Sequence, residues 1–144
     1  MTPLIRHYLE GKLFEWMMSL GMIGLGLEII LMPDTVNTPS FLLISLIFPK
    51  ISIDAFMIFF GSLRIAALVA NGRSTVYGPH ARAIGAIAGA VLWAQFDISI
   101  IYSLKHGSDS PPVAMAFWFV FIFGELYSAY RAAIDIRYHQ QSSA

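Results

Sequence analysis

Long apolar stretches separated by short polar breaks dominate the hydropathy pattern of this chain. The stretches are each about 20 residues long, which is the length that an α-helix needs to cross a hydrocarbon core of roughly 30 Å. Proline and glycine residues in the breaks, such as Pro33, Gly72 and Pro112, are typical of helix boundaries. We therefore expect four transmembrane helices, at residues 13–32, 51–70, 83–103 and 113–132.

The composition of the chain indicates the same class of protein. Of the 144 residues, 57% are hydrophobic and 12% are charged, which is unusual for a soluble domain and typical of a membrane protein. We predict an all-α fold, an integral membrane four-helix bundle, with residues 1–144 forming a single polytopic membrane domain. The net charge is zero and no basic patch carries interleaved aromatic residues, so nucleic acid is not an expected partner.

The distribution of basic residues predicts the orientation of the helices. The two chain ends and the connection between the second and third helices carry six basic residues: Arg6, Lys12, Arg73, Arg82, Arg131 and Arg137. The other two connections carry only Lys50 and Lys105. Because basic loops stay on the cytoplasmic side, both termini should be cytoplasmic (N-in/C-in), in what we expect to be a bacterial inner (cytoplasmic) membrane. The first stretch is too long for a signal-peptide core, so we expect it to remain as an anchor.

A further apolar segment, Phe41–Phe48, does not fit the pattern of spanning helices. It lies between Pro39 and Pro49 and is too short to cross a bilayer as a helix. We expect a short interfacial helix or a re-entrant segment between the first two spanning helices. A loop that packs on the bundle is the alternative interpretation.

An ionisable residue occurs inside each long apolar stretch: Glu28, Arg64, Asp97 and Glu125. A charge in the bilayer core is costly and is tolerated where it is paired or faces protein or water. Helical spacing places Glu28, Arg64 and Asp97 on faces rich in glycine or alanine, and small residues let membrane helices approach closely. We therefore expect these charges to point at other helices and not at lipid.

Depth along the helices predicts which of these residues meet. Arg64 and Glu125 should both lie in the inner half of the membrane, and we expect them to form an intramembrane ion pair with a structural role. Glu28 and Asp97 should both lie in the outer half, without a basic residue at their depth. Two acids in a low dielectric cannot both stay ionised at little cost, so Glu28 and Asp97 form a candidate cation or proton site. The alternative is that both are hydrogen-bonded contacts between helices.

Several glycines are predicted to be helix-packing positions. Gly85 and Gly89 form a G-x-x-x-G pattern in the third helix, and Gly21, Gly24 and Gly61 lie in the first two. In an apolar helix this spacing is a packing motif of low specificity. It implies self-association through the first or third helix only if these faces are unused within one chain.

The sequence contains few residues suited to catalysis or cofactor binding. The absence of cysteine excludes disulfides, thiolate metal sites, iron–sulfur ligation and cysteine nucleophiles. No H-E-x-x-H, nucleophile elbow or phosphate-binding loop is present, and the four histidines lie outside the predicted spans. We therefore predict no catalytic residue, no cofactor and no metal site, and expect a protein that is not an enzyme.

Two functional hypotheses remain. The first is a non-enzymatic small polytopic membrane protein, a structural or interaction subunit of a membrane complex. Its partners would be the lipid bilayer and either further copies in a homo-oligomer or other membrane proteins. The alternative is an oligomeric cation or proton pathway, meaning a channel, a transporter or a phage-type pore, in which the intramembrane acids carry out ion transport.

Overall fold

The computed structural model describes residues 3–47, 50–71, 77–107 and 112–141. Over these residues the chain is all-helical, with five α-helices and two 3-10 helices. In chain order they are α1 (Pro3–Leu31), η1 (Pro33–Asn37), η2 (Pro39–Phe41), α2 (Leu42–Ile47), α3 (Lys50–Asn71), α4 (Tyr77–Lys105) and α5 (Pro112–Gln141).

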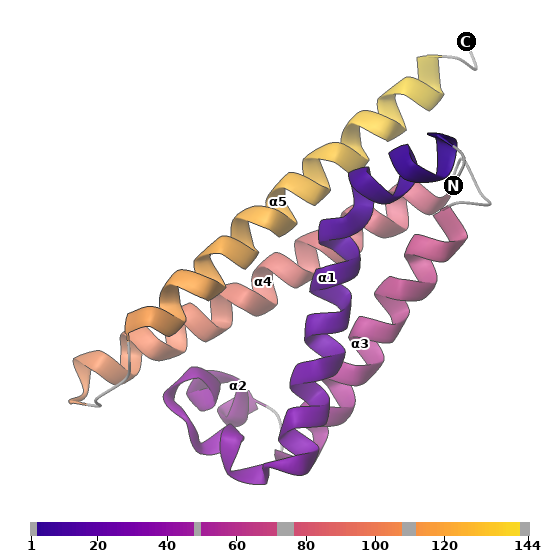
Figure 1. Cartoon of the computed structure of the whole chain (residues 1–144). Helices are drawn as coiled ribbons and strands as arrows, with labels where there is room; N and C mark the ends of the chain where they lie inside the picture. Colours follow the sequence, from indigo (N-terminus) through magenta and orange to yellow (C-terminus); the bar gives the residue numbers. More distant parts are fainter. Residues whose placement is uncertain (1–2, 48–49, 72–76, 108–111, 142–144) are drawn as a thin grey trace.

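The long helices form two helical hairpins. Figure 1 shows α1 beside α3 and α4 beside α5, and the contacts between elements pair them in the same way. The hairpins approach each other at the end where α1 begins and α5 ends, and they diverge toward the other end. The short elements η1, η2 and α2 lie at the diverging end, where η2 and α2 pack against α4.

Three of the described helices are long and apolar enough to cross a membrane. They are Lys12–Leu31 of α1, Ser52–Val69 of α3 and the whole of α4. The expectation of an all-helical protein with helices long and apolar enough to span a membrane is confirmed for these three helices. The fourth predicted span, residues 113–132, lies within α5. Over its described residues, α5 is not one of the helices long and apolar enough to span a membrane. That α5 crosses the membrane therefore stays a prediction.

The helices extend beyond the apolar stretches from which they were predicted. α1 begins at Pro3 instead of near residue 13, and α5 continues to Gln141. α4 begins at Tyr77, so Pro79 lies in its first turn, where the missing backbone N–H has no helical acceptor to lose. Membrane thickness limits the apolar length of a helix, whereas backbone hydrogen bonding continues through polar residues until a break occurs.

The side chains are distributed inside out compared with a soluble protein. Large apolar residues are widely exposed on the described helices, for example Met17 (61%), Phe59 (67%) and Phe119 (57%). The buried residues, by contrast, include many polar and charged side chains: Glu15, Ser19, Arg64, Arg82, Asp97, Ser99, Ser103, Glu125 and Ser128. Contiguous exposed apolar surface on this scale marks contact with lipid or with another protein.

The segment between α1 and α3 packs into the molecule. Phe41 and Ile44 are 2% and 4% exposed and belong to the apolar core. The ring of Phe41 meets the ring of Phe96 edge to face at 5.0 Å, and the backbone N–H of Leu43 donates a hydrogen bond to Ser99 Oγ (3.2 Å). The expected short helix is therefore present as α2 (Leu42–Ile47), and with η2 it packs against α4. Its position relative to a membrane stays a prediction.

Close contact between α1 and α3 depends on two glycines. A Cβ on Gly61 would lie 2.7 Å from the carbonyl oxygen of Ser19, and one on Gly26 would lie 2.8 Å from that of Asp54. The backbones of the two helices therefore touch at both points. Gly61 and Gly26 therefore both lie at points of close packing between the two helices.

Gly21 and Gly24 do not pack against another helix of this chain. Both are exposed, and a Cβ on either would meet nothing within 4 Å. Among the described residues these two glycines therefore make no close helix contact, and self-association through this face stays a prediction. Gly24 lies two residues from Gly26, which is about 200° around a helix, so the glycines lie on opposite faces.

The difference between these faces predicts the effect of adding one methyl group. Gly61→Ala should lower the free energy of unfolding by about 1–3 kcal/mol because its Cβ would push the two backbones apart. Gly24→Ala, whose methyl enters open space, should not destabilise the protein. Thermal unfolding of both purified variants in detergent measures the difference, and equal midpoints would contradict the close α1–α3 contact.

Candidate functional site

The structure places Arg64 of α3 against Glu125 of α5 in its interior. The Arg64 guanidinium donates two hydrogen bonds to the carboxylate: Nη1 to Oε1, and Nη2 to Oε2 at 2.6 Å. The two side chains are 7% and 0% exposed. These are the residues whose depth and opposite charge suggested a pair. In this two-pronged geometry each guanidinium N–H that faces the carboxylate meets an acceptor, which offsets part of the cost of burying both charges.

Two glycines of α4 make room for this ion pair. A Cβ on Gly89 would lie 2.6 Å from Glu125 Oε1 and 2.7 Å from Arg64 Nη1. A Cβ on Gly85 would lie 3.6 Å from Cγ of Arg64. The G-x-x-x-G pattern was expected to receive another helix backbone. In this structure its glycines instead face two charged side chains, because Arg64 and Glu125 meet against this face of α4.

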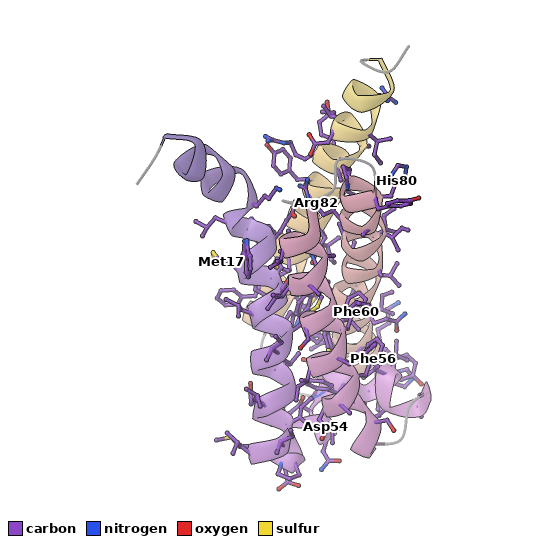
Figure 2. All side chains as sticks on the ribbon, turned by 90° about the vertical axis from the view of Figure 1, so that its right-hand side faces the viewer. Met17, Asp54, Phe56, Phe60, His80 and Arg82 are labelled. Carbon is purple, nitrogen blue, oxygen red and sulfur yellow. The ribbon has the colours of Figure 1, made fainter. Side chains whose placement is uncertain are left out.

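A second buried network surrounds Arg82 of α4. Its guanidinium donates from Nε to Glu15 Oε2 (2.9 Å), from Nη2 to Glu15 Oε1 (2.5 Å) and from Nη1 to Asp135 Oδ2 (2.8 Å). The Arg82 and Glu15 side chains are 3% and 7% exposed. Figure 2 shows Arg82 near one end of the molecule and Asp54 near the other.

Sequence reasoning missed this second network. Arg82 was treated only as a loop charge that sets orientation, and Glu15 was not considered although it lies in the first apolar stretch. A helical signal was present, since Glu15, Ser19 and Met22 share the buried face of α1. Asp135 follows the apolar part of α5 and gives no hydropathy signal.

Both networks join one hairpin to the other. Arg64 and Glu125 link α3 to α5, and Arg82 and Glu15 link α4 to α1. A cavity of about 10 Å³ lies between the networks, lined by Glu15, Arg64 and Arg82 among other residues. This volume holds about one water molecule, and three of its neighbours can hydrogen-bond to one. The arrangement is therefore a polar column that holds the two hairpins together.

The two remaining acids are placed differently from each other. Asp97 is 7% exposed, and its buried Oδ1 atom has no hydrogen-bond partner among the described residues. Glu28 is exposed, as are Met17 and Gly21 along the same helical face. Glu28 does not take part in the contact between α1 and α3, because α1 packs on α3 through its opposite face. A site shared by both acids stays a prediction.

A cluster of aromatic rings fills the interior near Asp97. Trp93 of α4 stacks on Trp118 of α5 with ring centroids 5.3 Å apart, and Phe96 and Phe121 meet Trp118 at 5.0 and 5.8 Å. The indole Nε1 atom of Trp118 is buried without a hydrogen-bond partner among the described residues. The rings pack α4 against α5, and Phe41 extends the cluster to η2.

Neither a metal-binding arrangement nor a comparison with known proteins assigns a function to this chain. Among the side chains that the structure describes, no group of three or more His, Asp or Glu residues is arranged to hold a metal ion. Comparisons of the chain with protein-family models, curated proteins and solved structures found no match. The class of protein is therefore argued from the fold: a helical protein with three apolar helices long enough to span a membrane.

Proposed function

We propose that this chain is an integral membrane protein whose role is structural, as an interaction subunit of a membrane complex and not as an enzyme. The observation that carries the proposal is the inverted distribution of side chains. Apolar residues such as Phe119 and Phe123 are exposed, while Arg64 and Arg82 are buried against carboxylates. Internal ion pairs of this kind fix the mutual position of helices, and an apolar exterior suits lipid and partner helices.

The proposal includes a topology. In it, α5 is the fourth spanning helix, both termini are cytoplasmic and the membrane is a bacterial inner membrane. The bias of basic residues supports this orientation. It is further supported by the beginning of α1 and the end of α5, which lie at the same end of the molecule (Figure 1).

Pairing of the buried charges favours a structural role over ion permeation. Arg64 and Arg82 each form a two-pronged contact with a carboxylate, so the acids Glu125 and Glu15 are occupied and are not free to receive a passing cation. The alternative function, an oligomeric cation or proton pathway, is favoured by one observation. Asp97 has a buried carboxylate oxygen without a partner among the described residues, which is the kind of group that ion pathways use.

Flux measurements separate the two functions. We expect proteoliposomes containing the purified protein to show no cation or proton flux above that of protein-free vesicles. Asp97→Asn, which keeps the shape of the side chain and removes its charge, should leave this result unchanged. Flux through the wild-type protein that disappears in Asp97→Asn would overturn the structural proposal and place Asp97 on a pathway.

A second preparation, an extract of the native membrane, tests for an interaction subunit. In a mild detergent extract of its native membrane, the protein should migrate in a complex larger than the recombinant chain alone. Migration of the native protein as the isolated chain would contradict the proposal. A native complex equal in size to the recombinant oligomer would identify the partner as further copies of this chain.

A further inference from the structure

A ligand-sized cavity lies at the diverging end of the two hairpins. Its volume is about 370 Å³, within the range of roughly 300–1,000 Å³ that small-molecule sites occupy. The walls come from α1, from η1 and η2 with the residue that joins them, and from α4 and α5. The lining residues that matter here are Leu25, Glu28, Thr38, Phe41, Ile100 and Trp118.

The cavity is polar at its mouth and apolar at its inner wall. Glu28 and Thr38 are exposed, so they lie where the cavity meets the surroundings. Phe41 and Ile100 are 2% and 1% exposed, so they form its interior side. A ligand that fills such a cavity would place a polar group at the mouth and an apolar body inside.

The charge at the mouth is negative and unbalanced. Glu28 is the charged residue in the lining, and its carboxylate makes no hydrogen bond or ion pair with any residue that the structure describes. A carboxylate at the rim of an apolar cavity is stabilised by an opposite charge within a few ångströms. The polar group of a matching ligand is therefore a cation.

We propose that this cavity binds a small amphiphilic organic cation, of the class of alkylated ammonium compounds with an aromatic or alkyl body. The ammonium group would lie at Glu28, and the body would pack against Phe41, Ile100 and Trp118. Aromatic rings such as those of Phe41 and Trp118 pack well against an aromatic or alkyl body. The proposal goes beyond the structural role described above and does not depend on it.

Benzyltrimethylammonium is the probe for this site, because it combines a permanent charge with one aromatic ring. Isothermal titration calorimetry on the full chain, purified in a nonionic detergent, should detect saturable binding of this cation. Phenylacetate, which carries an anion on a similar body, should not bind. Absence of saturable binding by the cation, or equal binding of the anion, would overturn the proposal.

Variants of the carboxylate test the role of charge. Glu28→Gln should weaken binding of benzyltrimethylammonium at least about tenfold, equivalent to about 1.4 kcal/mol, whereas Glu28→Asp should retain most of the affinity. Asp34→Asn is the matched control, since Asp34 is an exposed acid on the neighbouring η1 that does not line the cavity. Equal affinity for Glu28→Gln and the wild type would contradict the proposal.

A second pair of variants tests the position of the site without changing charge. Ala114 lines the cavity, whereas Ala116 is exposed on the same helix and does not line it. Ala114→Phe should abolish binding by filling the cavity, and Ala116→Phe should leave it unchanged. Binding that survives Ala114→Phe in a folded protein would place the ligand elsewhere. These measurements require neither flux nor a partner, so this proposal and the structural role stand or fall separately.

Discussion

Glu125→Ala should lower the free energy of unfolding by about 3–5 kcal/mol, the usual cost of leaving a buried charge without its partner. The substitution removes the carboxylate that receives two hydrogen bonds from Arg64 and leaves the guanidinium, 7% exposed, in the interior. Equilibrium unfolding of the purified protein in mixed micelles measures the loss. Arg131→Ala is the matched control, because Arg131 is an exposed residue of the same helix.

Removal of both charges distinguishes an ion pair from two independent side chains. The double variant with Arg64→Met and Glu125→Leu should be close to the wild type in stability, since a buried ion pair and apolar residues of similar volume are often equivalent. The coupling energy from the double-mutant cycle should therefore be large. Additive losses, or a stable Glu125→Ala variant, would show that the pair does not hold α3 to α5.

The second large effect is expected at Gly89. Gly89→Ala should destabilise the protein by about 1–3 kcal/mol, because the added Cβ would lie 2.6 Å from Glu125 Oε1 and 2.7 Å from Arg64 Nη1. The two charged groups would therefore have to separate or move. Thermal unfolding in detergent, with the oligomeric state followed by light scattering, measures both consequences.

Gly85→Ala is the matched control for this prediction. The nearest atom to a Cβ on Gly85 is Cγ of Arg64 at 3.6 Å, an ordinary contact, and alanine is the better helix former by about 1 kcal/mol. Gly85→Ala should therefore be neutral or stabilising. If Gly85→Ala and Gly89→Ala instead both dissociate an oligomer, the G-x-x-x-G pattern mediates association between chains. It would then not serve as the packing site of the ion pair.

The two ends of the molecule differ in the forces that hold them together. At the converging end, Arg82 joins Glu15 and Asp135, and the Arg64–Glu125 pair lies deeper in the bundle. At the diverging end, α2 and the two 3-10 helices that precede it lie between the hairpins, and aromatic and apolar contacts replace ion pairs. The proposed ligand cavity lies at this second end, where no buried ion pair among the described residues closes the space.

Some features of the site were predictable from the residues alone. Arg64 and Glu125 have opposite charges at similar depth in apolar stretches, and few other partners could satisfy either of them. Arg82 and Asp135 were not predictable in the same way, because they lie beyond the apolar stretches and resemble ordinary solvated charges. Glu28 shares a face with Gly21 and Gly24 as predicted, but glycines occur on both faces of α1 and composition does not indicate which of these faces packs on α3.

The sequence by itself determined the apolar lengths of the long helices, their boundaries to within a few turns at most and the presence of charges among apolar residues. These properties are local, because they depend on the hydropathy and helix-forming tendency of consecutive residues. Only the tertiary structure decided which face of α1 meets α3, that Gly89 receives an ion pair, and that Glu28 borders a cavity. Those outcomes depend on the rotation of each helix about its axis and on its choice of neighbour, and both are set by packing between residues far apart in the chain.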